Sequence, residues 1–236
     1  MGFRREPNEE STFFRRLNDA ILMRHGALWN HPAPFKKLLL DHKACQMLAL
    51  EVHQKTHQFP ALEYWGPLLR TGVQRKYTYW GWKDPRMSIV LPIWLESFSE
   101  ATVIQVVRNG IDVANSLWSR DIRMREEGSK NLPIEYPSLM DNFQLWCDYM
   151  EFSDDALQNW QGNCFTMQYE NLLESPHEGI SELAAFLSIE APASLSRMVN
   201  TTRKYAFLEN PESLALYQQV KDHPYMVKYN YHHISN

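Results

Sequence analysis

An arginine and a serine eight residues apart form the pattern with the clearest chemical potential in this chain. Arg108 ends the run Val103-Ile-Gln-Val-Val, which is typical of a strand buried on both faces of a parallel sheet. Open α/β sheets bind ligands at the carboxyl edge that such a strand reaches. Asn109 can cap a helix beginning beside Arg108, and the free N–H groups of a helix start attract anions. Ser116, two turns further on, adds a hydroxyl, so the segment predicts a phosphate-type anion site.

The same spacing has a plainer explanation. Segments in which a strand, an arginine and a helix follow one another are common in α/β proteins. Arg108 can therefore simply end a strand, and Ser116 can face a neighbouring helix. The residues alone leave both interpretations open.

The elements that would position Arg108 alternate between helices and short strands. Strands are expected at 102–108 and 164–170, with a third candidate near 77–82, where aromatic residues gather. A capping box is expected at Ser175-Pro176-His177-Glu178. Apolar periodicity predicts helices near 13–22, 35–55, 87–98, 110–127, 138–160, 176–187, 194–202 and 212–222. This alternation favours an α/β fold with a parallel sheet.

The bulk composition limits the classes of protein to which the chain can belong. Its 236 residues are 44% hydrophobic and 22% charged, which fits one globular domain spanning residues 1–236. The net charge of −4 offers no general attraction to nucleic acid or to an anionic membrane, so neither is an expected partner. Since no signal peptide and no run of membrane-spanning length is evident, the expected compartment is the cytoplasm.

No metal site or disulfide framework is expected. The cysteines, Cys45, Cys147 and Cys164, are far apart and form no CxxC pair, so we interpret them as small buried hydrophobes. His53 and His57 would share one face of a helix, with Glu51 nearby, and could be imagined as a metal pair. The HExxH pattern and an evident third ligand are both missing, which argues against a metal.

Three motifs in order give the chain a resemblance to sulfotransferases that use 3′-phosphoadenosine 5′-phosphosulfate (PAPS). The segment from Arg108 to Ser116 resembles that family's 3′-phosphate motif. Upstream, Trp82-Lys83-Asp84-Pro85-Arg86 is similar to a segment of the bacterial and tyrosylprotein-type branches. Downstream, Met167-Gln-Tyr169-Glu170-Asn171-Leu172-Leu173 resembles the family's later YE-x-L strand and helix. The resemblance spans roughly residues 8–230 and implies a P-loop NTPase-like three-layer fold, with a short parallel sheet flanked by helices.

The resemblance also implies roles for individual residues. Arg108 and Ser116 would bind the 3′-phosphate of PAPS, and Tyr169 would contact the nucleotide, although an aromatic at a strand end also suits a core. Lys83 would stabilise the negative charge that develops on the bridging oxygen as the sulfonate leaves. The plainer interpretation of Lys83 is a surface lysine beside a turn. We expect Asp84 to orient this loop or to pair with Arg86 rather than to act in catalysis.

An acceptor would need a group that takes up its proton. Asn8-Glu9-Glu10-Ser11 resembles the EE-S/T segment of the tyrosylprotein branch, in which the second glutamate is the base. The match implies Glu10 as catalytic base, although adjacent glutamates in a charged stretch are usually a solvated run. The acceptor would be a hydroxyl or amine on a small molecule, sugar or peptide, and the polar stretch 128–137 is a candidate lid.

The loop that binds the 5′-phosphosulfate in this family, similar to G-x-x-R-S-G-T-T, has no match in the chain. We expect the first strand and this loop to be missing because either the reading frame or the stretch of sequence that was taken starts too late. The exposed sheet edges that remain could favour homo-oligomers. One alternative is therefore an inactive relative that binds nucleotide or a partner protein. A small nucleotide or sugar kinase is less favoured, because neither a P-loop Lys-Ser/Thr nor a Mg²⁺-holding carboxylate is evident.

Overall fold

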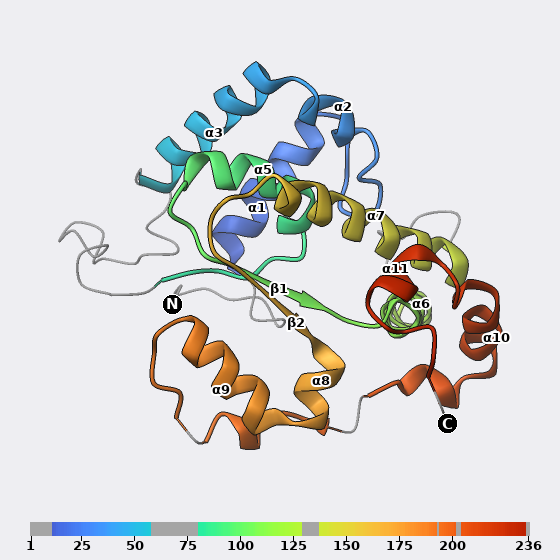
Figure 1. The fold of residues 1–236 in the computed structure, drawn as a ribbon. Coiled ribbons are helices and arrows are strands. Elements are labelled where there is room, and N and C mark those ends of the chain that lie inside the picture. Colours follow the sequence, from blue (N-terminus) through green and yellow to red (C-terminus); the bar gives the residue numbers. More distant parts are fainter. Residues whose placement is uncertain (1–10, 58–79, 129–136, 193, 202–203, 235–236) are drawn as a thin grey trace. The chain divides into compact units, whose positions relative to one another are not determined.

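The structure, a computed structural model, describes residues 11–57, 80–128, 137–192, 194–201 and 204–234. The chain divides into two compact units, which are described separately (Figure 1). The first unit comprises Met1–Ala101 and Asp148–Gly162, and the second comprises Thr102–Cys147 and Asn163–Asn236. Within the described parts of the chain, every helix is too short or too polar to cross a membrane.

The first unit is helical and is built around one hydrophobic core. Its helices are α1 (Thr12–Arg24), α2 (Phe35–Leu39), α3 (His42–His57), α5 (Met87–Ser97) and the second half of α7 (Leu139–Gln158). The largest fully buried side chains of this core include Phe14, Phe35, Ile89 and Trp94. Because apolar residues recur at helical spacing, each helix buries one stripe and leaves its charged residues outside.

The single helix expected over 35–55 is two helices. The break falls at Leu40 and Asp41, and the Asp41 side chain accepts a hydrogen bond from the Ala44 N–H at 3.0 Å. An aspartate that caps a new helix start in this way ends the preceding helix, since its own backbone is no longer helical. The apolar periodicity continued across the break and gave no sign of it.

The second unit contains a parallel two-stranded sheet among the residues that the structure describes. Strand β1 (Val103–Val107) pairs with β2 (Cys164–Gln168), and Val107 lies opposite Gln168. The remaining elements are α6 (Gly110–Glu126), the first half of α7, α8 (Tyr169–Glu174), α9 (Pro176–Phe186), α10 (Pro211–Val220), α11 (Pro224–Lys228) and the 3₁₀ turns Ser196–Met198 and Ala206–Glu209. A short parallel sheet flanked by helices is the α/β class predicted from the sequence.

Two strand predictions need correction. Residues 80–84 form no strand, because Trp82 instead stacks on Phe14 with ring centroids 4.0 Å apart; residues 77–79 lie outside the described parts. Strand β1 was expected to be buried on both faces, yet Ile104 and Val106 are 41% and 58% exposed. Both residues point to the same face of the strand, so the described elements leave that face partly open.

Three smaller predictions also differ from the structure. The Ser175 side chain makes no capping hydrogen bond, because Ser175 also ends α8 and its backbone must serve both helices. Strand β2 ends at Gln168, so Tyr169 and Glu170 begin a helix rather than complete a strand. Cys45 and Cys147 are buried as expected, but Cys164 opens β2 on an exposed position.

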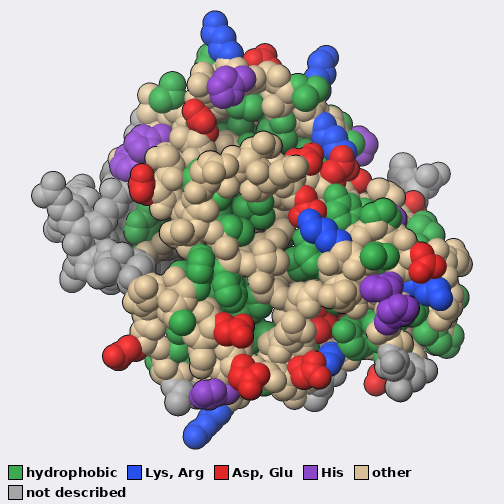
Figure 2. All heavy atoms as spheres, in the orientation of Figure 1, with side chains coloured by type: hydrophobic (Ala, Val, Ile, Leu, Met, Phe, Trp, Pro, Cys, Tyr) green, Lys and Arg blue, Asp and Glu red, His purple; other side chains and the backbone are tan. Residues whose placement is uncertain are grey.

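Charged groups are interspersed on the face of the molecule drawn in Figure 2. Basic and acidic side chains alternate there with hydrophobic and uncharged polar surface. This mixture agrees with the small net charge of −4. Any anion site must therefore depend on a few positioned groups rather than on a general positive field.

Candidate functional site

Arg108 and Tyr169 meet at the carboxyl edge of the two-stranded sheet. Each residue directly follows its strand, and the register that pairs Val107 with Gln168 makes them neighbours. The Arg108 guanidinium carbon lies 5.1 Å from the centroid of the Tyr169 ring, which is a cation–π distance. The structure thus brings together two of the residues singled out from the sequence.

Helix α6 begins immediately after Arg108, as its cap predicts. The Asn109 side-chain oxygen accepts hydrogen bonds from the N–H groups of Ile111, at 2.9 Å, and Asp112, at 3.2 Å. Gly110 is required at the next position, because a Cβ there would lie 2.6 Å from the Trp146 ring. Two local features of the sequence therefore fix where the helix starts and how closely α7 approaches it.

The Arg108 guanidinium has one buried donor, Nε, that no described residue accepts. Its nearest acidic partner is Asp112, with Nη2 and Oδ2 3.5 Å apart, a weak contact for an ion pair. The buried Arg108 Nε and Asp112 Oδ2 have no hydrogen-bond partner within the described residues. A buried donor without a partner is costly unless a ligand or water satisfies it, so the Arg108 Nε suits an anion, whereas the Asp112 oxygen suits a donor such as water or a ligand hydroxyl.

Neighbouring groups and burial shift the pKa of the Asp112 carboxyl group in opposing directions. Burial raises the pKa of its carboxyl group above the ordinary value, and the nearby Glu170 adds to this effect. The Arg108 guanidinium and the Phe207 N–H, which donates to Asp112 Oδ1 at 2.9 Å, act in the lowering direction. The net shift of the Asp112 pKa is upward, because the cost of burying the charged carboxylate is the largest of these effects.

Ser116 lies on the same helix as these groups. It is exposed and follows Asp112 by four residues, so the two share one face of α6. Its hydroxyl remains open to a ligand that reaches along this face from Arg108.

Glu170 also lies at this edge, although the sequence alone indicated no role for it in the site. Glu170 is only 2% exposed, and its carboxylate accepts hydrogen bonds from the Asn109 N–H at 2.9 Å and the Tyr231 hydroxyl at 2.6 Å. Its position two residues after the end of β2 was the available signal, because residues that follow one parallel strand lie near the turn that follows the neighbouring strand. Tyr231 lies near the end of the given sequence, and no motif there indicated a role in the site.

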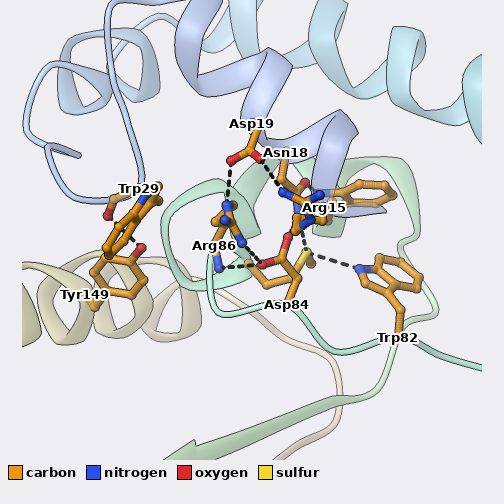
Figure 3. Close-up of polar contacts among 10 residues, drawn as sticks. Arg15, Asn18, Asp19, Trp29, Trp82, Asp84, Arg86 and Tyr149 are labelled. Atoms are coloured by element: carbon orange, nitrogen blue, oxygen red, sulfur yellow. Dashed lines mark hydrogen bonds and ion pairs between the residues drawn. The ribbon is translucent and has the colours of Figure 1, made fainter. Parts of the chain in front are cut away.

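Lys83 belongs to the first unit and is exposed in a loop that its neighbours anchor firmly. Asp84 is only 4% exposed, and both of its carboxylate oxygens are occupied (Figure 3). Oδ2 accepts from the Asn18 side-chain amide at 2.8 Å. Oδ1 accepts from Arg86 twice, from Nη1 at 2.9 Å and from the backbone N–H at 3.1 Å. The expected pairing of Asp84 with Arg86 is confirmed.

Helix α1 provides the other half of this anchor. The Arg86 Nε donates to Asp19 at 2.5 Å, and Trp94 of α5 donates its indole N–H to Asn18 at 2.8 Å (Figure 3). Burial acts to lower the pKa of Arg86, but Asp84 and Asp19 outweigh it and the pKa is raised. The loop before α5 is thus held by a compact buried network, from which Lys83 projects.

The histidine pair is engaged in local contacts. The rings of His53 and His57 stack with centroids 4.4 Å apart, and His57 Nδ1 lies 2.7 Å from the His53 carbonyl. Glu51 forms ion pairs with Arg24 and Lys55, each at 2.6 Å, and its hydrogen bond to Arg24 is the main cause that lowers its pKa to about 2. Among the residues described, no three potential metal-binding side chains gather.

The remaining sequence predictions fall on parts that the structure does not describe. Glu10, the expected base, lies in residues 1–10, and the expected lid at 128–137 lies almost wholly in residues 129–136. Lys83 lies in the first unit, whereas Arg108, Ser116 and Tyr169 lie in the second.

Comparison with known proteins identifies the family. A model described as "Sulfotransferase family" matches residues 4–193, which is most of the chain and includes Lys83, Arg108, Ser116 and Tyr169. Neither the curated proteins nor the solved structures that were searched gave a match. With the match extending through both units, the chain belongs to the sulfotransferase family.

Proposed function

We propose that the chain moves a sulfonate group from PAPS to a hydroxyl or amine acceptor, in the manner of the bacterial and tyrosylprotein-type branches of the family. The observation that carries this proposal is the buried Nε of Arg108 at the carboxyl edge of the sheet, which finds no hydrogen-bond partner among the described residues. We treat residues 1–236 as a single sulfotransferase-like domain and the acceptor as a small molecule, sugar or peptide.

The residues at this edge fit the 3′-phosphate end of the nucleotide. Arg108 would contribute charge and a directional fork of donors, and the start of α6 would add the positive end of its dipole. Ser116 would supply a hydroxyl from the same helix. Tyr169, already in contact with the guanidinium, would hold Arg108 in place and offer its ring to the base.

Two further residues would serve the transfer itself. PAPS supplies the sulfonate and the leaving group. Lys83 would place an ammonium where charge develops on the leaving oxygen, and the network around Asp84 would keep its loop in place. Glu10 would take up the acceptor's proton.

A second candidate function is a relative that binds the nucleotide's 3′ end without catalysing transfer. The residues that meet at the Arg108 edge of the sheet would serve such binding equally well. Binding and transfer must therefore be measured separately.

Binding of adenosine 3′,5′-bisphosphate is expected to raise the melting temperature of the wild type by about 5 °C at roughly one hundred times Kd. Arg108→Ala should show little or no shift, because its charged fork makes the main phosphate contacts. Thermal-shift titration with the bisphosphate and with ATP checks this. Arg120→Ala, which changes another arginine of α6, is the matched control and should retain the shift. A wild type that the bisphosphate leaves unshifted would contradict both candidate functions.

Lys83→Ala is expected to reduce sulfonate transfer about 100-fold or more while leaving bisphosphate binding unchanged. The reason is that an ammonium on the leaving oxygen matters in the transition state rather than in the bound ground state. Transfer of radiolabelled sulfonate from PAPS into a cell extract measures the effect. Lys37→Ala, an exposed lysine of the same unit, should transfer normally. Binding without any transfer by the wild type would support the second candidate instead.

A further inference from the structure

We propose that Glu170 and Tyr231 form a buried positioning pair that holds the turn carrying Arg108 in its nucleotide-binding conformation. This role rests on the function proposed above and adds two residues to it. Neither residue would touch the nucleotide. Both would act through the backbone next to Arg108.

The first step is the contact between Glu170 and the turn. The Glu170 carboxylate accepts the N–H of Asn109, the residue that directly follows Arg108, at 2.9 Å. The peptide plane that joins Arg108 to Asn109 is therefore held through its own N–H group. Holding that plane constrains the backbone from which the Arg108 side chain leaves, while the Tyr169 ring contacts the guanidinium itself.

The second step is the lock on Glu170 itself. The Tyr231 hydroxyl donates to the other carboxylate oxygen at 2.6 Å and lies 3.5 Å from the Val107 carbonyl of β1. Tyr231 is almost fully buried, and burial, reinforced by Glu170, raises the pKa of its hydroxyl, which keeps it a neutral donor. Each oxygen of Glu170 thus accepts a hydrogen bond from a different donor, the Asn109 N–H for one and the Tyr231 hydroxyl for the other.

The third step is the anchoring of Tyr231 across the ends of both strands. Gln168, the last residue of β2, donates its side-chain amide to the Tyr229 carbonyl at 2.8 Å. Residues 229–231 are therefore tied to β2 through Gln168 and approach β1 at Val107. A segment near the end of the sequence closes over the site-bearing edge of the sheet.

The contacts of Glu170 indicate that it positions the turn rather than binding the nucleotide directly. Within the described residues, no ion pair joins Glu170 to Arg108, whereas Asp112 lies 3.5 Å from the guanidinium. Both oxygens of Glu170 accept hydrogen bonds from other groups. Glu170 therefore does not compete with a phosphate for the N–H donors of Arg108. Glu170 therefore contributes geometry, and the cost of burying its charge is offset by two short hydrogen bonds.

Tyr231→Phe is expected to weaken adenosine 3′,5′-bisphosphate binding about tenfold and to leave binding of adenosine 5′-phosphate, which lacks the 3′-phosphate, nearly unchanged. Glu170→Ala should weaken the bisphosphate at least as much. Glu170→Gln, which keeps an oxygen for the Asn109 N–H, should restore most of the affinity. Calorimetric titrations with both nucleotides give the ratio of dissociation constants, which a general loss of stability would not change selectively.

The matched control is Tyr217→Phe. Tyr217 is also buried, and its hydroxyl accepts a hydrogen bond from the Ile234 N–H at 3.1 Å rather than donating to Glu170. A second measurement, hydrogen exchange of the peptide covering residues 108–112 without nucleotide, should show faster exchange in Tyr231→Phe than in Tyr217→Phe. It tests the positioning contact independently of binding.

The outcomes distinguish the two levels of the proposal. If the wild type binds both nucleotides equally, the proposed function fails and the positioning role falls with it. If the wild type prefers the bisphosphate but Tyr231→Phe keeps that preference and exchanges like the control, only the positioning pair is refuted. A lost preference together with faster exchange at 108–112 supports it.

Discussion

Asp84→Ala should lower the free energy of unfolding by about 3–5 kcal/mol, because it removes a buried carboxylate that accepts three hydrogen bonds. Arg86 would lose the carboxylate that accepts both its Nη1 and its backbone N–H. The Asn18 amide would also lose its acceptor. Urea unfolding monitored by tryptophan fluorescence is a suitable measurement, since Trp82 and Trp94 lie in the same cluster.

The matched control is Glu151→Ala in the same unit. Its carboxylate also pairs with a cation, Lys36 at 2.6 Å, but both side chains are more than two-fifths exposed. Solvent screens such a pair, so its removal should cost less than about 1 kcal/mol. If Asp84→Ala and Glu151→Ala lowered the free energy of unfolding by similar amounts, the Asp84 network would contribute no more than a surface ion pair. Asp84→Asn, which keeps an acceptor, should lie between the two.

Gly110→Ala should cost about 3 kcal/mol and reduce bisphosphate binding as well. The added methyl would meet the rigid Trp146 ring at 2.6 Å, so either α7 or the start of α6 must shift. Because Gly110 is two residues from Arg108, a shift of the helix start also displaces the anion site. Chemical denaturation and nucleotide titration of the same sample measure the two effects.

Gly81→Ala is the control for this substitution. Among the described residues other than its chain neighbours, a Cβ at Gly81 meets no atom within 4 Å, so the free energy of unfolding of the variant should lie within about 0.5 kcal/mol of the wild type. If Gly110→Ala were equally neutral, the close approach of Trp146 to the start of α6 would not constrain the site.

The parts of the site that could be predicted from the sequence depend on neighbours in the chain. The run Val103–Val107, the cap Asn109 and the arginine between them predict a strand, a turn and a helix start without reference to the rest of the chain. The pairing of Asp84 with Arg86 is similarly local, since the two residues are two positions apart. Contacts between residues this close in sequence can be predicted, because the local backbone geometry alone brings their groups together.

The parts that could not be predicted depend on tertiary contacts. Tyr231 and Asn109 each meet Glu170 across 61 positions of sequence, and Asn18 meets Asp84 across 66. No periodicity encodes such pairs. The same limit explains the strand expected near 77–82, where the aromatic character of Trp82 serves packing on Phe14 rather than a sheet. Propensity is overruled when a large ring finds a better partner elsewhere.

The central claim, that Arg108 at the end of β1 binds the nucleotide's 3′-phosphate, is tested most directly by a ratio of affinities. Calorimetry gives the dissociation constants of adenosine 3′,5′-bisphosphate and adenosine 5′-phosphate for the wild type and for Arg108→Ala. We predict that the 3′-phosphate tightens binding to the wild type by about 30-fold and that this advantage nearly disappears in Arg108→Ala. Equal advantages in the two proteins would contradict the claim.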